Sequence, residues 1–422
     1  DVSDTEMMVA FPVGSQHLNV RSFGCFTRDL YEIARCLKDH GIASIAMEST
    51  GVYWIPLFLV LKEYGFEVLL VNARHTKNVT GRKDDESDAE WIQKLHSCGL
   101  LSGSFQPDNL TRALRSLVRH RNGLVRTSTD YINRIQKALE LMNIKLHTVI
   151  SDIDGKTGRT IIEAILSGER NPEVLSEMRA PGIKATQQEM IKSLEGHWTD
   201  EHLFELKQCY QLYSIHQEMI QACDSEIEKQ LLIHIASANQ GEIPEIGEVK
   251  RKQSYKRKIS FNLTAYLKEL QGVDITEVIG ISEVSALTIF SEVGTDMTKW
   301  KTAHHFTSWL GLAPNTKKSG GKVISSRIAK KKHYAGQAFR VAANSLFNSK
   351  TPLGDYYRRI RGKAGPAKAV VATARKLAVI YYAMVANKQA FNPKALANFQ
   401  QQHKMKKINQ LKKKIAQLEA AA

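Results

Sequence analysis

Cysteine is scarce in this chain of 422 residues, and the five cysteines present follow no pairing or ligand spacing. No CxxC pair occurs, so the sequence excludes a disulfide-stapled scaffold, and the thiols suit a reducing cytoplasm. Long apolar runs are also missing. The longest, Val52 to Leu61, is too short to span a bilayer, and Val370 to Ala386 is interrupted by Arg375 and Lys376. With no secretory signal visible, we expect a cytoplasmic protein and no membrane partner.

Acidic residues are outnumbered, because 43 Asp and Glu stand against 59 Lys and Arg. The formal charge is +16 and the pI about 9.5. An excess of positive charge of this size gives information about binding partners and not about the fold. A polyanion such as nucleic acid is the simplest partner. The 43% of apolar residues can bury more than one core, so the length predicts two or three domains.

The first seventy residues alternate between strand and helix patterns. Met7 to Phe11 and Leu18 to Phe23 predict the two strands of a hairpin. Arg28 to His40 carries apolar residues at helical spacing. Two short buried strands, Ser44 to Met47 and Val68 to Val71, then flank a second helix. This order predicts a mixed sheet covered by helices, and hence an α/β domain.

Four acidic residues fall where such a sheet can bring them together. Asp85 and Asp88 are three apart at the expected start of a helix, so both carboxylates lie on one face. Asp1 stands at the head of the first strand, and Glu48 ends the third. Four like charges in one place need a cation, and hard oxygen ligands in that number suit Mg²⁺ or Mn²⁺. Two such ions could clamp the attacking and leaving oxygens of a phosphodiester.

A plainer interpretation of the same helix start is capping. Asp, Ser and Glu accept the free backbone N–H groups at a helix N-terminus, and Ser87 with Glu90 forms a capping-box pattern. Taken alone, the spacing of Asp85 and Asp88 favours capping. The two acids at strand ends shift the balance toward a metal site.

Two long helical patterns occupy the middle of the chain. Leu110 to Leu146 combines an apolar stripe with many basic residues, which form either a solvated face or a surface that follows phosphates. His202 to Ile235 has apolar spacings of three, four or seven, which favour a coiled coil or helical hairpin. The basic residues of the first pattern are Arg112, Arg115, Arg119, Arg121, Arg126, Arg134 and Lys137. Those expected to bind nucleic acid are Arg115, Arg119, Arg126 and Arg134.

A second site of interest lies within Gly311 to Ile328, where Ser319 precedes a pair of glycines. Paired glycines let the backbone approach a ligand closely. From composition alone a flexible polar turn is favoured, and no His–Asp pair stands nearby to form a protease-like relay. The lysines that flank the serine, and that could steady phosphate oxygens, are Lys317, Lys318 and Lys322.

Basic residues also cluster toward the C-terminus. Leu353 to Ala386 begins with a basic stretch and continues as an apolar helix, which suits contact with a duplex backbone. The contacts expected there are Arg358, Arg359 and Arg361. Glu248 to Ser260 is a dense basic linker. The tail after Asn392 is rich in Lys and Gln and has too few heptads for a stable coiled coil.

Several of these segments carry a recognisable pattern. DVSD at Asp1, AMESTGVYW around Glu48 and GRKDDESDAEWI around Asp85 resemble the amino-terminal domain of the insertion-sequence one-ten family of DEDD transposases. The resemblance implies a RuvC-like, ribonuclease H-type fold whose acidic tetrad is Asp1, Glu48, Asp85 and Asp88. The segment around Ser319 resembles the family's carboxy-terminal domain, in which the serine before the paired glycines is the nucleophile. Where the family usually has a segment like Ile-Ser-Lys-Arg-Gly, this chain has IAKKKHY.

The resemblance also implies a function and partners. Members of this family are recombinases that excise and insert an insertion sequence. A structured noncoding RNA from the element's own end, the bridge RNA, pairs with double-stranded donor and target DNA, so the sequence code lies in the RNA. The family further implies Mg²⁺ or Mn²⁺, a homo-oligomer (dimer or tetramer), and a bacterial or archaeal cytoplasm in which the protein associates with the nucleoid.

The sequence therefore predicts an α/β RuvC-like domain followed by mostly α-helical coiled-coil and transposase domains. The expected divisions are a catalytic domain at 1–108, a helical region at 109–244, a basic linker at 245–262, a transposase domain at 263–390 and a basic tail at 391–422. Two alternatives stay open. One is a metal-dependent junction nuclease that uses water, which would not need Ser319. The other is a nucleic-acid-binding protein whose catalytic site has decayed, which the intact tetrad disfavours.

Overall fold

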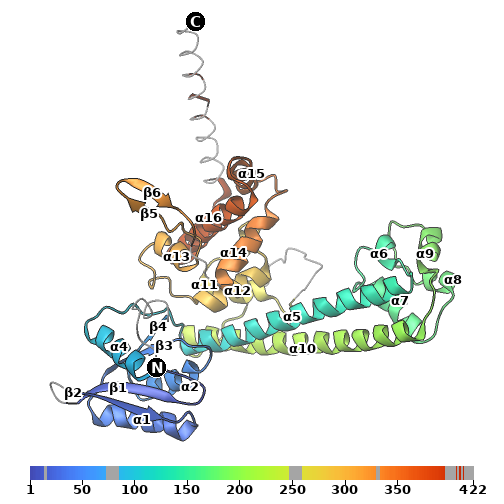
Figure 1. The fold of residues 1–422 in the computed structure, drawn as a ribbon. Coiled ribbons are helices and arrows are strands. Elements are labelled where there is room, and N and C mark those ends of the chain that lie inside the picture. Colours follow the sequence, from blue (N-terminus) through green and yellow to red (C-terminus); the bar gives the residue numbers. More distant parts are fainter. Residues whose placement is uncertain are drawn as a thin grey trace. The chain divides into compact units, whose positions relative to one another are not determined.

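The computed structural model describes residues 1–13, 17–72, 85–246, 259–328 and 333–394, together with 405, 408, 409 and 412. For residues 17 and 85–87 the backbone alone is described. The chain forms two compact units, Asp1–Gln106 and Pro107–Ala422 (Figure 1). The boundary falls close to the predicted end of the catalytic domain at residue 108. The second unit includes the predicted helical region and transposase domain, whereas most of the predicted basic linker and basic tail lies outside the described residues.

The strands of the first unit form two small sheets. β1 (Met7–Val13) and β2 (His17–Phe23) pair antiparallel, which confirms the predicted hairpin. β3 (Ser44–Glu48) and β4 (Glu67–Val71) pair parallel, as expected for strands joined through a helix. The four strands do not join into the mixed sheet that the sequence predicts. Instead, β1 and β3 line a common cavity of about 270 Å³, and no ladder of backbone hydrogen bonds joins these two strands.

Three helices of the first unit pack around these strands. α1 (Thr27–Asp39) buries Leu30, Ile33, Ala34 and Leu37, the apolar stripe that predicted it. α2 (Trp54–Glu63) buries Leu57 and Leu61 in the same core, together with Phe11 of β1. α4 (Asp85–Ser97) packs against β1, β2 and β3. The core therefore holds the strand ends that carry the predicted acids in fixed positions.

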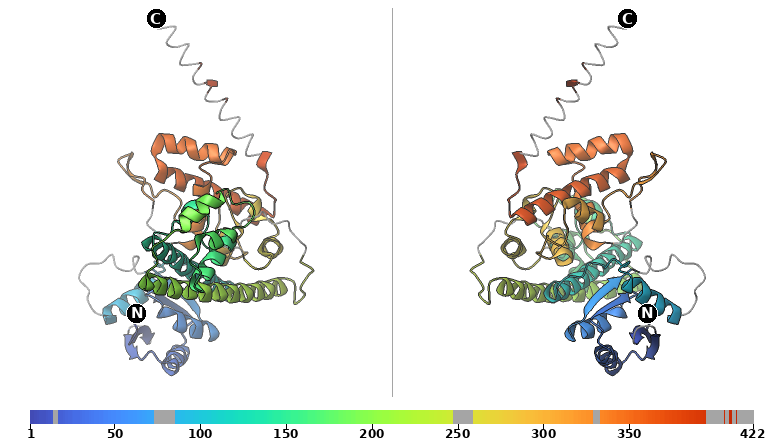
Figure 2. Two further views of the ribbon diagram at one scale, coloured as in Figure 1. Left: turned by 90° about the vertical axis from the view of Figure 1, so that its right-hand side faces the viewer. Right: turned by 90° about the vertical axis from the view of Figure 1, so that its left-hand side faces the viewer.

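Two long antiparallel helices dominate the second unit. α5 (Asn109–Leu141) and α10 (Asp200–Ala238) lie side by side in every view (Figure 1, Figure 2). Buried residues of α10 recur every seven positions, at Leu206, Tyr213, Ile220 and Ile227. This is the heptad period of a coiled-coil seam, so the predicted helical hairpin is confirmed.

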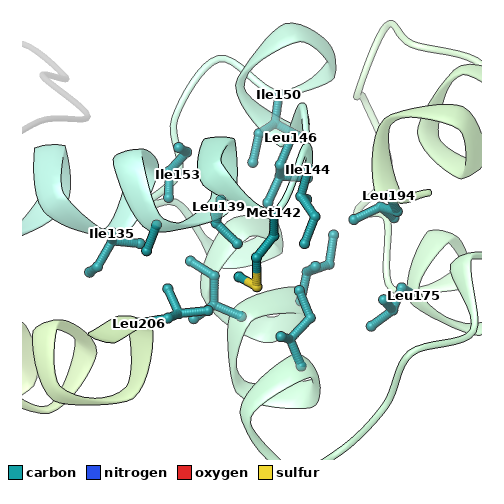
Figure 3. Close-up of a cluster of buried hydrophobic side chains, with 14 of the residues drawn as sticks. Ile135, Leu139, Met142, Ile144, Leu146, Ile150, Ile153, Leu175, Leu194 and Leu206 are labelled. Atoms are coloured by element: carbon teal, nitrogen blue, oxygen red, sulfur yellow. The ribbon is translucent and has the colours of Figure 1, made fainter. Parts of the chain in front are cut away.

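A small helical subdomain, which we call the tip, lies at one end of the hairpin. It consists of α6 (Leu146–Val149), α7 (Lys156–Leu166), α8 (Pro172–Glu177) and α9 (Gln187–Leu194). Its core joins Leu175 and Leu194 to Met142 of the hairpin (Figure 3). Where the chain enters and leaves the tip, His197 N donates to Met142 O at 2.8 Å. The sequence interpretation did not anticipate this subdomain.

The C-terminal part of the second unit is a helical body that carries one β-hairpin. Its elements are α11 (Leu263–Gln271), η1 (Ile275–Glu277), α12 (Glu283–Val293), α13 (Ala303–Trp309), β5 (Lys317–Ser319), β6 (Lys322–Ser325), α14 (Tyr334–Ser345), α15 (Pro352–Ala364) and α16 (Pro366–Asn387). By length and composition α16 could cross a membrane. It is nevertheless the central helix of this body, because Leu377 and Tyr381 are fully buried and the Tyr381 hydroxyl accepts a hydrogen bond from Gln271 Nε2 at 2.7 Å.

Candidate active site and nucleic-acid surface

Two of the predicted acids lie on the strands of the first unit. Glu48 is the last residue of β3 and is only 6% exposed, and its Oε1 accepts a hydrogen bond from Thr50 Oγ1 at 3.2 Å. Asp1 lies beside β1, because its ammonium group donates to Met8 O at 2.8 Å and Met8 N donates to Asp1 O at 3.2 Å. The backbone thus fixes Asp1, and burial in the strand end fixes Glu48.

The other two acids belong to α4. This helix begins at Asp85, so Ser87 lies inside the first turn and cannot be the N-cap residue of the alternative capping interpretation. Asp88 is half-buried, whereas the side chain of Asp85 lies outside the described residues. At the other end of the helix, His96 Nε2 and Ser44 Oγ are 3.0 Å apart, which ties α4 to the start of β3.

Of the three described acids, one lines the cavity between β1 and β3, and the other two lie next to residues that line it. Asp1 lines it directly, and so do Met47, next to Glu48, and Ala89, next to Asp88. Among the side chains that the structure describes, no group of three or more His, Cys, Asp or Glu is arranged to hold a metal ion. The donors available are all carboxylates, the oxygen ligands that Mg²⁺ and Mn²⁺ prefer, so their chemistry fits such an ion.

Ser319 lies at the end of a tight β-hairpin instead of a flexible turn. β5 and β6 pair antiparallel, and Gly320 (φ 53°) and Gly321 (φ 75°) form the two-residue connection. Positive φ at both central residues is the requirement of the type I′ turn, which glycine meets at no steric cost. Ser319 is exposed, and its hydroxyl makes no hydrogen bond within the part of the chain that the structure describes. The nucleophile candidate is therefore accessible to a large substrate.

The hairpin register separates the three lysines around this serine. Lys322 lies directly opposite Ser319, whereas Lys318 lies opposite Val323, one pair further from the turn. Successive pairs of an antiparallel ladder point to opposite faces, so Lys322 shares the face of Ser319 and Lys318 does not. Lys317 lies beyond an irregularity in the register and pairs with Ser325.

Two of the predicted phosphate-binding arginines of α5 are instead engaged by α12. Arg115 donates to the backbone oxygens of Ser291 and Glu292, at 3.3 and 2.9 Å. Arg119 makes a bidentate pair with the Glu292 carboxylate, at 2.8 and 3.0 Å, and lies over the ring of Tyr334. These guanidinium groups hold α5 against the C-terminal body, so we leave them out of the proposed nucleic-acid surface.

The remaining arginines of α5 differ sharply in exposure. Arg121, expected on the solvated stripe, is 2% exposed and forms a buried ion pair with Asp224 of α10. Arg126 and Arg134 are exposed. Arg126 Nε donates only to Asn122 O on its own helix, at 3.3 Å, and the Arg134 guanidinium lies 5.6 Å from the ring centre of Tyr131. These last two remain placed for contact with phosphates.

A second basic surface forms where α15 packs on α16. Arg359 of α15 and Lys376 of α16 both face the ring of Tyr356, at 5.3 and 4.7 Å from its centre. Partial burial, and then the nearby Arg359 charge, lower the pKa of Lys376. Arg361 lies over Phe347, whereas Arg358 donates to the carbonyl oxygens of residues 347 and 349 and pairs with Asp355.

Lys376 was not among the residues expected to bind nucleic acid, because the sequence analysis took this part of α16 for an apolar helix interrupted by Arg375 and Lys376. The available signal was a lysine inside that apolar pattern, next to Arg375. An anion bound between Arg359 and Lys376 would offset the repulsion between these two cations.

Comparison with known protein families finds two matches. Residues 1–144 match a family model described as a transposase, of the IS110 DEDD type, and residues 274–358 match a model described as the transposase IS116/IS110/IS902 family. The first match includes all four predicted acids, and the second includes Ser319 and its hairpin. The tip and all of α10 lie between the two matched segments. A comparison with curated proteins finds no match.

Proposed function

Because the chain belongs to the IS110 family of DEDD transposases, enzymes that act on DNA in the transposition of insertion sequences, we propose that it exchanges DNA strands through a covalent bond to Ser319. In the cleavage step a bond forms between Ser319 Oγ and phosphorus, and one bond from phosphorus to a deoxyribose oxygen breaks. The serine hydroxyl loses a proton and the leaving oxygen gains one. Joining to a new strand reverses this step, so the phosphodiester energy is conserved.

The observation that carries this proposal is the presentation of Ser319. An exposed hydroxyl next to a Gly320–Gly321 turn gives a DNA backbone room to approach, and Lys322 lies directly opposite the serine on the neighbouring strand. The rival serines are placed less well. Ser325 lies toward the base of the hairpin, where its hydroxyl accepts a hydrogen bond from Arg327 N at 3.3 Å.

The acids of the first unit form the second part of the proposal. We assign this unit to the RuvC-like, ribonuclease H-type fold, with Asp1, Glu48, Asp85 and Asp88 as holders of Mg²⁺ or Mn²⁺. Bound there, divalent cations supply positive charge for the phosphate and for the oxygens that attack and leave it. The supporting observation is that Asp1 lines the cavity between β1 and β3, while Glu48 and Asp88 each lie next to a residue that lines it.

The third part concerns RNA and assembly. We propose that a bridge RNA, paired with donor and target DNA, directs the reaction, and that the exposed arginines of α5 and α15 bind nucleic-acid phosphates. The exposed cations in question are Arg126, Arg134, Arg359 and Arg361. The protein would act as a homo-oligomer, dimer or tetramer, in the cytoplasm.

Adduct trapping tests the serine chemistry. Active protein is mixed with labelled donor DNA and its RNA, denatured during the reaction, and digested so that the DNA-bound peptide can be mapped. We expect the adduct at Ser319, its loss in Ser319→Ala with nucleic-acid binding retained, and mild effects of Ser325→Ala and Ser326→Ala. Cleaved DNA without any protein adduct would support the competing water-using nuclease.

A further inference from the structure

The three lysines of the serine hairpin are equivalent in the sequence but not in the structure. Ser319 and Lys322 are a cross-strand pair that flanks the Gly320–Gly321 turn, while Lys318 belongs to the next pair with Val323. Side chains of a directly opposed pair project from the same face, with Cβ atoms about 5 Å apart. The face that presents Ser319 therefore also presents Lys322, and the opposite face presents Lys318.

We infer that Lys322 is the residue that positions the scissile phosphate for attack by Ser319, an inference that rests on the proposed serine chemistry. A lysine ammonium on a four-carbon stem, rooted beside the serine, can reach a non-bridging oxygen of a phosphate in contact with Ser319 Oγ. It binds as a point charge. Its role is to hold the phosphorus in line with the hydroxyl and to stabilise the charge that develops on the phosphate oxygens.

The surroundings of Lys322 suit this role better than those of three arginines elsewhere in the second unit. Arg115, Arg119 and Arg358 are already bound to carboxylates or backbone carbonyls. Within the described residues, no ion pair is formed by Lys322, which is exposed. Its charge is thus available to an incoming phosphate, and the tight turn holds its backbone in a fixed relation to the serine.

The experiment compares two variants that remove the same charge from the same hairpin. Single-turnover adduct formation at Ser319 is measured with saturating DNA for the wild type, Lys322→Ala, Lys318→Ala and Lys322→Arg. We expect Lys322→Ala to slow the adduct step by about a hundredfold, the cost typical of removing one stabilising donor, and Lys318→Ala to change it by no more than about threefold. Lys322→Arg should recover most of the rate, because it restores the charge. DNA affinity should fall equally in both alanine variants, since each removes one cation.

A substrate with a methylphosphonate at the scissile position separates positioning from folding. It lacks the charged oxygen that Lys322 is inferred to bind, so the Lys322→Ala and wild-type enzymes should react with it at similar rates. Rates of Lys322→Ala within about threefold of Lys318→Ala on normal DNA would overturn the inference while leaving the Ser319 adduct intact. A hundredfold loss that persists on the methylphosphonate would also overturn it, as a structural defect. If the wild type forms no adduct at Ser319, the proposed function itself fails.

Discussion

At the scale of single residues, buried charges hold the long hairpin in register. Arg121 and Asp224 are each 2% exposed and meet near the middle of the pairing between α5 and α10. Close by, Gln217 Nε2 donates to Ser128 Oγ at 2.7 Å. Apolar heptads alone would permit the helices to slide by one turn, whereas a buried ion pair is satisfied in one register only. The polar pairs therefore specify the alignment that the apolar seam stabilises.

Removing one partner of this ion pair should be costly. Asp224→Ala leaves a buried guanidinium without its counter-charge, so we expect a loss of about 3–5 kcal/mol in the free energy of unfolding. Urea denaturation measures it. The double variant Arg121→Met/Asp224→Leu, which removes both charges, should be much closer to the wild type. A double variant as unstable as the single one would contradict this account.

Glu48 offers a test of the acidic site that is independent of Ser319. Glu48→Gln keeps the shape of a side chain that is only 6% exposed but removes its charge. If the acids share divalent cations, DNA cleavage should be abolished, and thermal stability without metal should rise or stay level because like-charge repulsion eases. Cleavage is followed on labelled DNA and stability by the midpoint of thermal unfolding. Wild-type cleavage by Glu48→Gln would refute the shared site.

At the scale of elements, the β5–β6 hairpin that carries Ser319 depends on Gly320 and Gly321, and the two positions tolerate substitution differently. A non-glycine residue in the left-handed region costs roughly 1–2 kcal/mol, and a β-branched residue is among the worst choices there. Asparagine tolerates the first turn position, since Asn-Gly is a favoured type I′ pair.

We therefore expect Gly320→Asn to keep adduct formation within a few-fold of the wild type, and Gly321→Val to lose most of it while the helical body stays folded. Trapping measures adduct formation by both variants, and circular dichroism checks that the helical body stays folded. Equal activity of the two variants would show that the turn geometry is not needed.

Much of the element structure follows from local patterns. The apolar stripe of α1 and the apolar run of β1 are visible in the sequence because both elements bury side chains in the core. The β5–β6 hairpin was also readable, since Gly320–Gly321 precedes the β-branched Val323 and Ile324. Because the segment is rich in lysine, the sequence analysis interpreted it as a polar turn instead.

Other features depend on distant partners that no local pattern reveals. Arg119 looks like its exposed neighbours along α5, and only the fold brings Glu292 of α12 to it. The tip was missed because its four helices are short and share their core with the ends of α5 and α10. The four acids lie on separate segments of the chain, so the expected strand order only suggested their grouping, and the family resemblance named them as a tetrad.

At the scale of the whole molecule, charge is divided between the two units. Residues 1–106 contain 10 Lys and Arg against 14 Asp and Glu, while residues 107–422 contain 49 against 29. The first unit is thus formally −4 and the second +20. An acidic unit that needs cations and a basic unit that attracts polyanions suit an enzyme that works on a nucleic-acid backbone.

This division leads to a prediction about salt. Binding of an unrelated RNA should weaken by a factor of about 10³ or more between 50 and 200 mM salt, because counterion release dominates nonspecific contacts. The element's own RNA should lose less. Filter binding over a salt series measures both, and equal losses would count against guidance by a specific RNA. As matched controls, Arg126→Ala should reduce the slope by about one, whereas Arg115→Ala should lower stability and leave the slope unchanged.

The neck of the tip, where His197 N bonds to Met142 O and Lys145 N bonds to Ser193 O, has a further consequence. The chain leaves the hairpin and returns to it at nearly the same point, so the intervening segment behaves as an insertion into a continuous pair of helices. Loops of two to five residues can join antiparallel helices at such a point. Related proteins could therefore have a longer, shorter or different tip without any change in either matched segment. An unrelated domain whose termini are adjacent could also be inserted at this point.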